Sequence, residues 1–228
     1  KKLLSSKNIN NVDVCGDTRI DRVVKIASEN YENRFLADFS RNNFTIVCGS
    51  TWPDDERLLS EFINKSSDVY KFIIAPHEIE QKHIDTIQQS VNVPAILLSE
   101  IENKNPLDYK VIIVNSIGLL SKLYRFGNLA YIGGGFGKGI HNILEAAVYE
   151  IPVVFGPNYQ KFKEAVDLVK LDACFSVKTQ NELSNIINGV FCGDMYDVYA
   201  KNKAKQYISH SSGSTQHIFT KMHLIGEF

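Results

Sequence analysis

The chain has 228 residues, of which 44% are hydrophobic and 22% are charged, and its formal net charge is −1. This composition is typical of a folded globular protein and excludes a disordered or fibrous one. The balanced charge excludes a chain-wide basic surface for nucleic acid, so we expect no nucleic-acid partner.

The four cysteines lie far apart and form no C-x-x-C pair, so the sequence predicts neither a zinc site nor a disulfide framework. No apolar run reaches the roughly 18 residues that span a bilayer, and no secretory signal opens the chain. We therefore expect a soluble chain with reduced cysteines, located in the cytoplasm.

Short apolar runs alternate along the chain with longer amphipathic runs, a pattern that favours a parallel sheet covered by helices. Several apolar runs are rich in Val and Ile, as is typical of strands buried on both faces. The expected strands are 11–16, 44–50, 70–76, 95–100, 110–116, 129–135, 151–157 and 173–177. The expected helices are 19–30, 54–66, 78–91, 117–126, 141–149, 160–171, 180–192 and 195–208.

No Gly/Ser linker, internal repeat or low-complexity tract divides these elements. We therefore expect one Rossmann-like α/β domain over residues 1–208, followed by a less regular tail over 209–228. The clearest helix start lies in the stretch TWPDDE, where Thr51 or Asp54 would cap a helix with acidic residues in its first turn.

Five of the 14 glycines lie between Gly133 and Gly139, after an apolar run and before the stretch HNILEAA. Glycines at a strand end allow a sharp turn and a close approach of other groups to the backbone. A helix that opens at His141 would offer free N–H groups to a phosphate or carboxylate. The stretch therefore predicts either a binding site or merely a tight turn.

Two familiar glycine motifs do not fit this stretch. Lys138 stands where a G-x-G-x-x-G pattern that starts at Gly133 needs its third glycine, and Gly139 stands where a P-loop needs Ser or Thr. Beyond the glycines, Glu145 lies one helical turn after Asn142 and His141. Its carboxylate would accept hydrogen bonds from the vicinal hydroxyls of a ribose, or would be an ordinary first-turn acid.

Six stretches in the same order along the chain resemble blocks of the 3-deoxy-D-manno-octulosonic acid (Kdo) transferases, and in particular their Bacteroidetes-type members. Members of this family add Kdo from CMP-Kdo to a lipid A precursor, so the resemblance implies a part in lipopolysaccharide biosynthesis. The stretches are DTRIDRV (17–23), GSTWPDDE (49–56), IIAPHEIE (73–80), the run from VIIVNS to GGGF (111–136), GIHNILEAA (139–147) and GPNYQKFKEA (156–165).

The resemblance covers only the C-terminal, donor-binding half of the family's GT-B architecture. In the full-length family the N-terminal half binds the lipid acceptor, carries the general-base glutamate and associates with the membrane. The resemblance therefore implies that this chain is an excised domain, inactive alone and without a catalytic residue of its own. The full-length protein would act at the inner face of the inner membrane, where the tail would brace the N-terminal half.

The resemblance also implies donor-binding roles for two loops. Ser50 and Thr51 match the loop that faces the phosphate and sugar of the donor, although Thr51 is also a candidate helix cap. Ile117 and Gly118 match the place where main-chain groups meet the cytosine, although a plain turn would look the same.

The central donor site of the family matches the glycine stretch and the residues after it. Where many members have an arginine, in the pattern PRHPER, this chain reads PHEIE. His77 or Lys138 would then supply the positive charge beside the donor. The residues of this central site are Gly133, Gly134, Gly135, His141, Asn142 and Glu145.

The sequence carries no D-x-D motif of metal-dependent transferases, so we expect no metal and no cofactor besides the donor substrate. Two other functions fit the same fold. The chain would be the half of a UDP-sugar transferase or epimerase, or a non-catalytic nucleotide-binding module.

Overall fold

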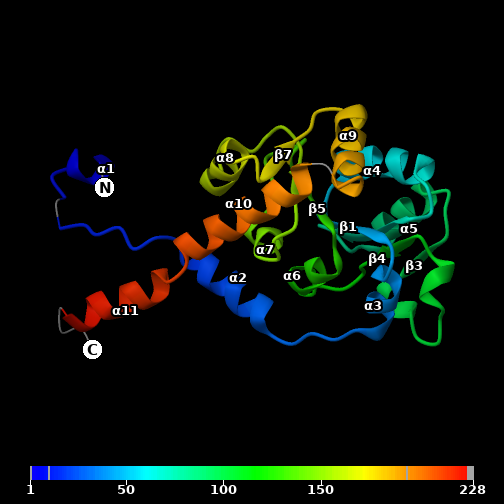
Figure 1. Cartoon of the computed structure of the whole chain (residues 1–228), viewed down its shortest axis with the longest axis horizontal. Coiled ribbons are helices and arrows are strands. Elements are labelled where there is room, and N and C mark those ends of the chain that lie inside the picture. Colours follow the sequence, from blue (N-terminus) through cyan, green and yellow to red (C-terminus); the bar gives the residue numbers. More distant parts are fainter. Residues whose placement is uncertain (1, 10, 194, 225–228) are drawn as a thin grey trace.

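Seven parallel strands form one sheet in the order β3-β4-β2-β1-β5-β6-β7 (Figure 1). The structure is a computed structural model that describes residues 2–9, 11–193 and 195–224, so the last four residues of the expected tail lie outside it. The strands confirm seven of the eight expected apolar runs. They are β1 Phe44–Thr51, β2 Tyr70–Pro76, β3 Ala95–Leu97, β4 Val111–Ile113, β5 Leu129–Ile132, β6 Val153–Phe155 and β7 Cys174–Ser176.

Helices connect successive strands and cover both faces of the sheet (Figure 1). The α-helices are α1 Lys2–Ser5, α2 Thr18–Ser28, α3 Arg34–Ser40, α4 Pro53–Lys65, α5 Gln81–Ser90, α6 Leu120–Leu123, α7 Leu144–Ala147, α8 Lys163–Lys170, α9 Gln180–Phe191, α10 Met195–Ser211 and α11 Ser214–Leu224. Three short 3-10 helices are η1 Leu98–Glu100, η2 Pro106–Asp108 and η3 Tyr124–Phe126. The predicted α/β class is confirmed.

The strands are buried on both faces because successive side chains point to opposite sides of the sheet. Val47 of β1 packs in a core with α2, α3, α6, α7, α8 and α10. Its neighbours Ile46 and Cys48 pack in a second core with α4, α5 and α9. Both layers bury fully apolar strand residues, which explains why the strands read as continuous apolar runs.

Three expectations about the elements were wrong. Residues 11–16 pair with no strand among the described residues, and Val14 is 64% exposed. The helix expected over 141–149 is one α-helical turn, α7, because 3-10-type bonds follow it and Glu150 adopts φ 60° before the Ile151-Pro152 step. The tail is not irregular, since α10 extends to Ser211 and α11 forms a further helix.

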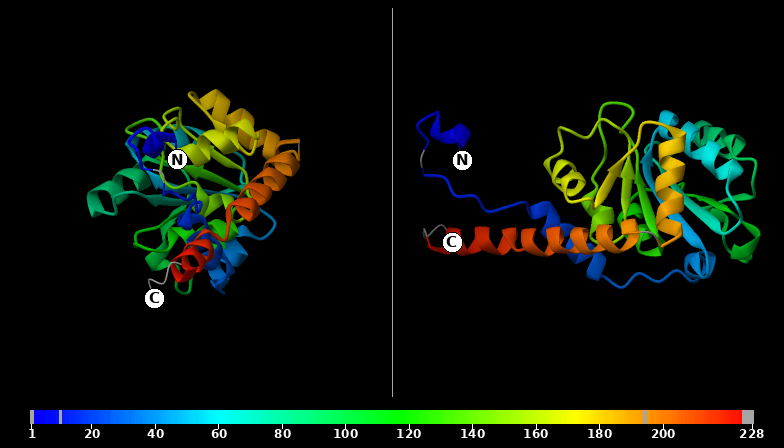
Figure 2. Two further views of the ribbon diagram at one scale, coloured as in Figure 1. Left: turned by 90° about the vertical axis from the view of Figure 1, so that its left-hand side faces the viewer. Right: turned by 45° about the horizontal axis from the view of Figure 1, so that its top comes forward.

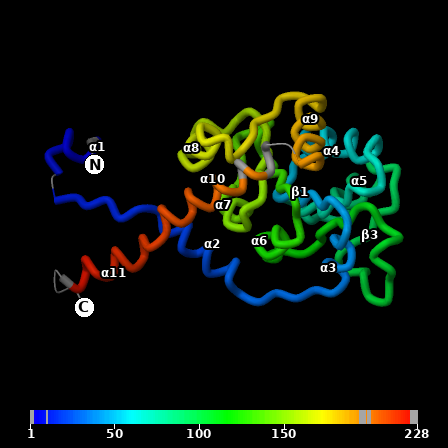
Figure 3. The backbone as a smooth tube through the Cα atoms, in the orientation of Figure 1, coloured from blue at the N-terminus to red at the C-terminus, as the bar shows by residue number. Residues whose placement is uncertain are grey.

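α11 and the segment before α2 project from the same side of the α/β body, as the right-hand view of Figure 2 and the trace in Figure 3 show. α11 continues outward from α10, and residues 2–9 and 11–16 run away from α2. Across the described ranges, no helix combines the length and the hydropathy that crossing a membrane requires.

The sheet reverses its winding direction at β1. The chain continues from β1 to β2 on one side, and only β5 begins the other side. In open parallel sheets, ligands bind beyond the carboxyl ends of the strands at such a switch point. The loops after β1 and β5 are therefore the first place to look for a site.

Candidate functional site

The loops after β1 and β5 touch through their backbones. β1 has a register shift at Ser50, whose φ is 53°, and Gly133 begins the loop after β5. A Cβ atom at Gly133 would lie 2.2 Å from the Ser50 carbonyl oxygen and 2.6 Å from Thr51 Cα. Only glycine fits there, so this glycine is required by a close approach of two main chains.

The glycine loop, residues 133–139, is held closed by main-chain hydrogen bonds. The Gly134 carbonyl accepts from Gly137 N at 3.0 Å and from Gly139 N at 3.2 Å. Asn158 clamps the loop from the far side, because its backbone N–H donates to Gly135 O and its side chain donates to Gly137 O. These hydrogen bonds define the turn from within the chain.

Asp55 ties the glycine loop to α4. It is 1% exposed, and its carboxylate accepts hydrogen bonds from Gly134 N at 2.8 Å, Trp52 N at 3.0 Å and Tyr131 Oη at 2.7 Å. Burial raises the pKa of Asp55, and these three hydrogen bonds oppose that rise. The helix begins at Pro53 with Trp52 as its N-cap residue, so neither Thr51 nor Asp54 caps it as expected.

Three aromatic side chains meet above this edge. Trp52 Nε1 donates a hydrogen bond to His141 Nε2 at 3.0 Å. His77, which follows β2, stacks on Trp52 with ring centroids 4.4 Å apart and lies 4.6 Å from the ring of His141. Burial, followed by the nearby His77, lowers the pKa of His141. The predicted residues His77 and His141 are thus brought together by a residue that was not predicted.

Asn142 and Glu145 are joined by a hydrogen bond of 3.2 Å from Asn142 Nδ2 to Glu145 Oε1. Burial raises the pKa of Glu145, and the Asn142 hydrogen bond and the positive charge of Arg22 on α2 oppose it. Asn142 Oδ1 also accepts from Leu144 N. Because α7 is a single turn, it provides little of the helix dipole expected for a phosphate. Loop N–H groups and side chains would have to supply those contacts.

The Thr51 hydroxyl does not face outward. Thr51 is fully buried, and its Oγ1 donates to Glu56 Oε1 at 2.9 Å. Glu56 Oε2 in turn lies 2.8 Å from His83 Nε2 on α5. The side chain of Thr51 therefore stabilises the loop from inside the protein. Of the two predicted residues on this loop, only Ser50 is partly exposed.

The remaining predicted residues are exposed on separate loops. Ile117 is 86% exposed, and Gly118 adopts φ 87° with open space around it. Their loop follows β4, at the same carboxyl edge but two strands away from β1. Lys138 is exposed at the tip of the glycine loop. The structure thus brings one cluster together around β1 and β5 and leaves the predicted base-recognition loop apart from it.

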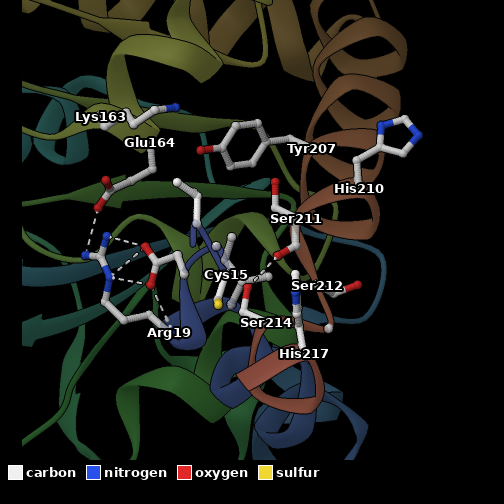
Figure 4. Close-up of a pocket in the computed structure, with 15 residues that line it drawn as sticks. Cys15, Arg19, Lys163, Glu164, Tyr207, His210, Ser211, Ser212, Ser214 and His217 are labelled. Atoms are coloured by element: carbon white, nitrogen blue, oxygen red, sulfur yellow. Dashed lines mark hydrogen bonds and ion pairs between the residues drawn. The ribbon is translucent and has the colours of Figure 1, made fainter. Parts of the chain in front are cut away.

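A separate cavity of about 660 Å³ lies at the root of the projecting tail (Figure 4). Its walls come from the start of α2, the start of α8 and the junction of α10 with α11. In it, Arg19 bonds both Asp17 and Glu164. None of the predicted donor-binding residues is among its described lining, so we place the candidate site at the glycine loop, where buried polar groups converge.

Sequence reasoning missed Trp52 and Asp55 as parts of the site. Both stand in the stretch GSTWPDDE, and each contacts a residue about 80 positions later in the chain. Two features could have indicated them. The single tryptophan of the chain and an acidic residue both stand just after a predicted strand end. Within the described residues, no group of three or more His, Cys, Asp or Glu side chains could hold a metal ion.

The fold and the position of the site define a class. The sheet and its two helix layers match the C-terminal halves of GT-B glycosyltransferases, so that part of the sequence prediction is confirmed. The C-terminal CMP-Kdo binding domain of WaaA from Acinetobacter baumannii superposes with a TM-score of 0.67 and 21% identity, over 82% of this chain and 97% of that domain. HepE from Anabaena in complex with UDP-glucose matches with a TM-score of 0.59 and 15% identity, over 90% of this chain and 55% of HepE.

The chain is also homologous in sequence to 3-deoxy-D-manno-octulosonic acid transferases. It is 35% identical over 143 residues to that of Aquifex aeolicus, covering 60% of this chain and 39% of the relative. It is 29% identical over 160 residues to that of Rickettsia bellii, covering 67% of this chain and 37% of the relative. The chain thus spans about two fifths of the length of these curated relatives. No protein-family model matches it.

Proposed function

We propose that this chain is the donor-binding part of a Kdo transferase and that CMP-Kdo binds at the edge formed by the loops after β1 and β5. The observation that carries this proposal is the sequence homology to Kdo transferases over 60–67% of this chain. The fold likeness to a domain described as CMP-Kdo binding supports it. A Bacteroidetes-type origin stays a prediction.

In this proposal the residues after the glycine loop hold the nucleotide. Glu145, kept in place by Asn142, accepts hydrogen bonds from the ribose hydroxyls. Within the glycine loop, the N–H groups of Gly133, Gly134, Gly137 and Gly139 are used in internal bonds, which leaves those of Gly135, Phe136 and Lys138 for the phosphate. The His141 ring and the exposed Lys138 side chain face the same phosphate, while His77 contributes a ring at the rim of the site. The loop of Ile117 and Gly118 meets the cytosine with its main chain, for which its exposed backbone is free.

The parent reaction is an inverting transfer in which an acceptor hydroxyl attacks the anomeric carbon of Kdo and CMP leaves. This part of the enzyme binds the donor and stabilises the charge that develops on the departing phosphate. The general base and the lipid A precursor site belong to an N-terminal half. We therefore expect no transfer by this chain alone when it is given CMP-Kdo and acceptor, and measurable transfer by it would overturn this point.

The projecting tail begins at the junction of α10 with α11, after Ser211, and not at the predicted boundary between residues 208 and 209. Residues 11–16 and α11 leave the body on the same side, next to the cavity of Figure 4. We propose that α11 braces the N-terminal half there, and that this half holds the full-length protein at the inner face of the inner membrane.

Calorimetric titration of the chain with CMP and with UMP tests the donor. We expect CMP to bind more tightly than UMP, and Glu145→Ala to abolish the heat of CMP binding. Glu61→Ala, which removes an exposed acid on α4, is the matched control and should bind CMP like the unaltered chain. Binding of neither nucleotide would contradict a donor site formed by this chain alone.

A UDP-sugar donor is the second candidate, favoured by the fold likeness to HepE with UDP-glucose bound. The same titration separates the two candidates, because a UMP preference or equal binding would support the UDP-sugar donor. A preference for CMP would exclude it.

A further inference from the structure

The hydrogen bond between Trp52 and His141 fixes the protonation state of the histidine ring. An indole N–H can only donate a hydrogen bond, so His141 Nε2 must accept it and carries no proton. A neutral imidazole holds one proton, which therefore resides on Nδ1. Free histidine in water favours the other tautomer, so this ring is held in its less common form.

The surroundings hold the ring in place on every side. The planes of Trp52 and His141 differ by 14°, a tilt that suits an in-plane hydrogen bond, and the ring of His77 packs against both. On the other side, His141 Cδ2 would lie 3.2 Å from a Cβ atom at Gly134, so the ring rests on the glycine loop. The backbone N–H of His141 donates to Gly133 O at 3.1 Å.

A second proton on His141 would oppose this arrangement. If Nε2 of His141 were protonated, two hydrogen-bond donors, this N–H and that of Trp52, would point at each other. The positive charge would also lie beside the ring of His77, which packs against His141. No carboxylate contributes to the pKa shift of His141. The ring is therefore built to stay neutral near pH 7.

We propose that Trp52 is a positioning residue that fixes His141 as its Nδ1–H tautomer, so that His141 offers a neutral hydrogen-bond donor to a phosphate oxygen of the bound nucleotide. The identity of the ligand in this inference rests on the proposed function, whereas the tautomer of His141 does not depend on it. Among the described residues, the His141 ring makes no hydrogen bond besides the one from Trp52, which leaves Nδ1–H available.

The tautomer is measured first, by NMR of the ligand-free chain with ¹⁵N-labelled histidine. We expect Nε2 to be the unprotonated nitrogen of His141 at pH 7.5, with the signal assigned by its loss in His141→Gln. Trp52→Phe keeps a ring but removes the donor, and should shift His141 toward the Nε2–H tautomer. His83→Gln is the matched control, because His83 bonds Glu56 instead, and should leave the His141 signals unchanged.

Trp52 is the one tryptophan of the chain, so its indole N–H gives a single signal. We expect that proton to be protected from exchange with solvent and to lose protection in His141→Gln. This second measurement needs no change at Trp52 and keeps the test valid if Trp52→Phe fails to fold. A protonated Nε2 or an unprotected indole N–H in the unaltered chain would overturn the tautomer.

The ligand is measured second, by titration with CMP. We expect CMP to shift the Nδ1–H signal of His141 and to bind about tenfold more weakly to Trp52→Phe, a change of about 1.4 kcal/mol. Equal CMP affinity of both proteins would overturn the ligand role of His141. If CMP fails to bind the unaltered chain, the proposed donor site fails while the tautomer measurement stands by itself.

Discussion

Two parts of the molecule are held in place in opposite ways. One is the edge of the sheet formed by the loops after β1 and β5, and the other is the projecting tail with α11. At the edge, buried Asp55 accepts three hydrogen bonds, and the backbone at Gly133 lies against that of Ser50. In the tail, α11 is anchored to α2 by the half-buried Asp21, which accepts from Gly213 N and Thr215 N. An exposed ion pair joins Lys221 to Asp13.

Buried hydrogen bonds and tight main-chain contacts stabilise the edge, whereas exposed ion pairs contribute little. The edge is therefore preformed by contacts within this chain. α11 is held at its start by Asp21 and further along by an exposed ion pair, so we expect it to open more readily than the edge.

The largest expected effect concerns Asp55. Asp55→Ala leaves the buried donors of Gly134, Trp52 and Tyr131 without an acceptor, so we expect the free energy of unfolding to fall by about 3 kcal/mol. Asp54→Ala is the matched control, since Asp54 is exposed and pairs only with Arg57. Urea unfolding measures both, and equal losses in the two variants would contradict a preformed edge.

A smaller loss is expected when a methyl group is added to the glycine loop. Gly133→Ala places Cβ within 2.2 Å of Ser50 O, so we expect a loss of about 2 kcal/mol in thermal unfolding. Gly137→Ala is the control, because the nearest atom to its Cβ is Gly134 O at 3.7 Å. If Gly133→Ala were as stable as Gly137→Ala, the close contact of the two loops would be wrong.

The tail should respond locally rather than globally. Asp21→Ala removes the acceptor for two N–H groups at the start of α11, an effect worth about 1 kcal/mol for a helix cap. We expect amide hydrogen exchange in α11 to become roughly fivefold faster, with the strands of the sheet unchanged. Asp13→Ala, which removes the exposed pair with Lys221 and a local hydrogen bond from Val14 N, serves as the control. Faster exchange throughout β1 would show that the tail is part of the core unit.

The smallest expected effect is an opposite pH dependence of two acids. Burial raises the pKa of Glu145, so its ionisation destabilises the fold as pH rises through that raised pKa. Hydrogen bonds from Thr215 lower the pKa of Asp21, so its contribution is present above about pH 4 and is lost as pH falls through the lowered pKa.

The same comparison can be made with two conservative variants. As pH rises from about 4 to about 7, Glu145→Gln should gain stability relative to the unaltered chain. Asp21→Asn should lose stability relative to the unaltered chain as pH rises from below toward about 4. Both changes should stay below about 1 kcal/mol because solvent screens partly exposed groups. Chemical unfolding at a series of pH values measures them, and slopes of the same sign would refute the contrast between edge and tail.

The sheet was predictable because its strands are apolar on both faces. Runs such as 44–50 and 70–76 match β1 and β2 almost residue for residue, because continuous apolar runs of this length are typical of strands buried on both faces. The run 11–16 also alternates apolar and polar residues, yet it forms no strand because no strand within the described residues pairs with it. The short helix α3 was missed because seven residues carry too little periodicity.

The composition of the candidate site was only partly predictable. The glycine stretch indicated a turn at a strand end, and the structure places Gly133 and Gly134 in such a turn. The pairing of Asn142 with Glu145 followed from their spacing. The donor-binding roles of these residues stay predictions, which the titrations with CMP test.

The sequence by itself determined the local features: which runs are buried, where glycine lets the chain turn, and which side chains lie a few residues apart. Tertiary structure alone decided that Trp52 bonds His141 and that Asp55 bonds Gly134, because the partners are 89 and 79 positions apart. It also turned Thr51 inward to Glu56 and directed α11 away from the body. Local patterns follow from backbone and side-chain preferences, whereas such contacts exist only once β1 and β5 lie side by side in the sheet.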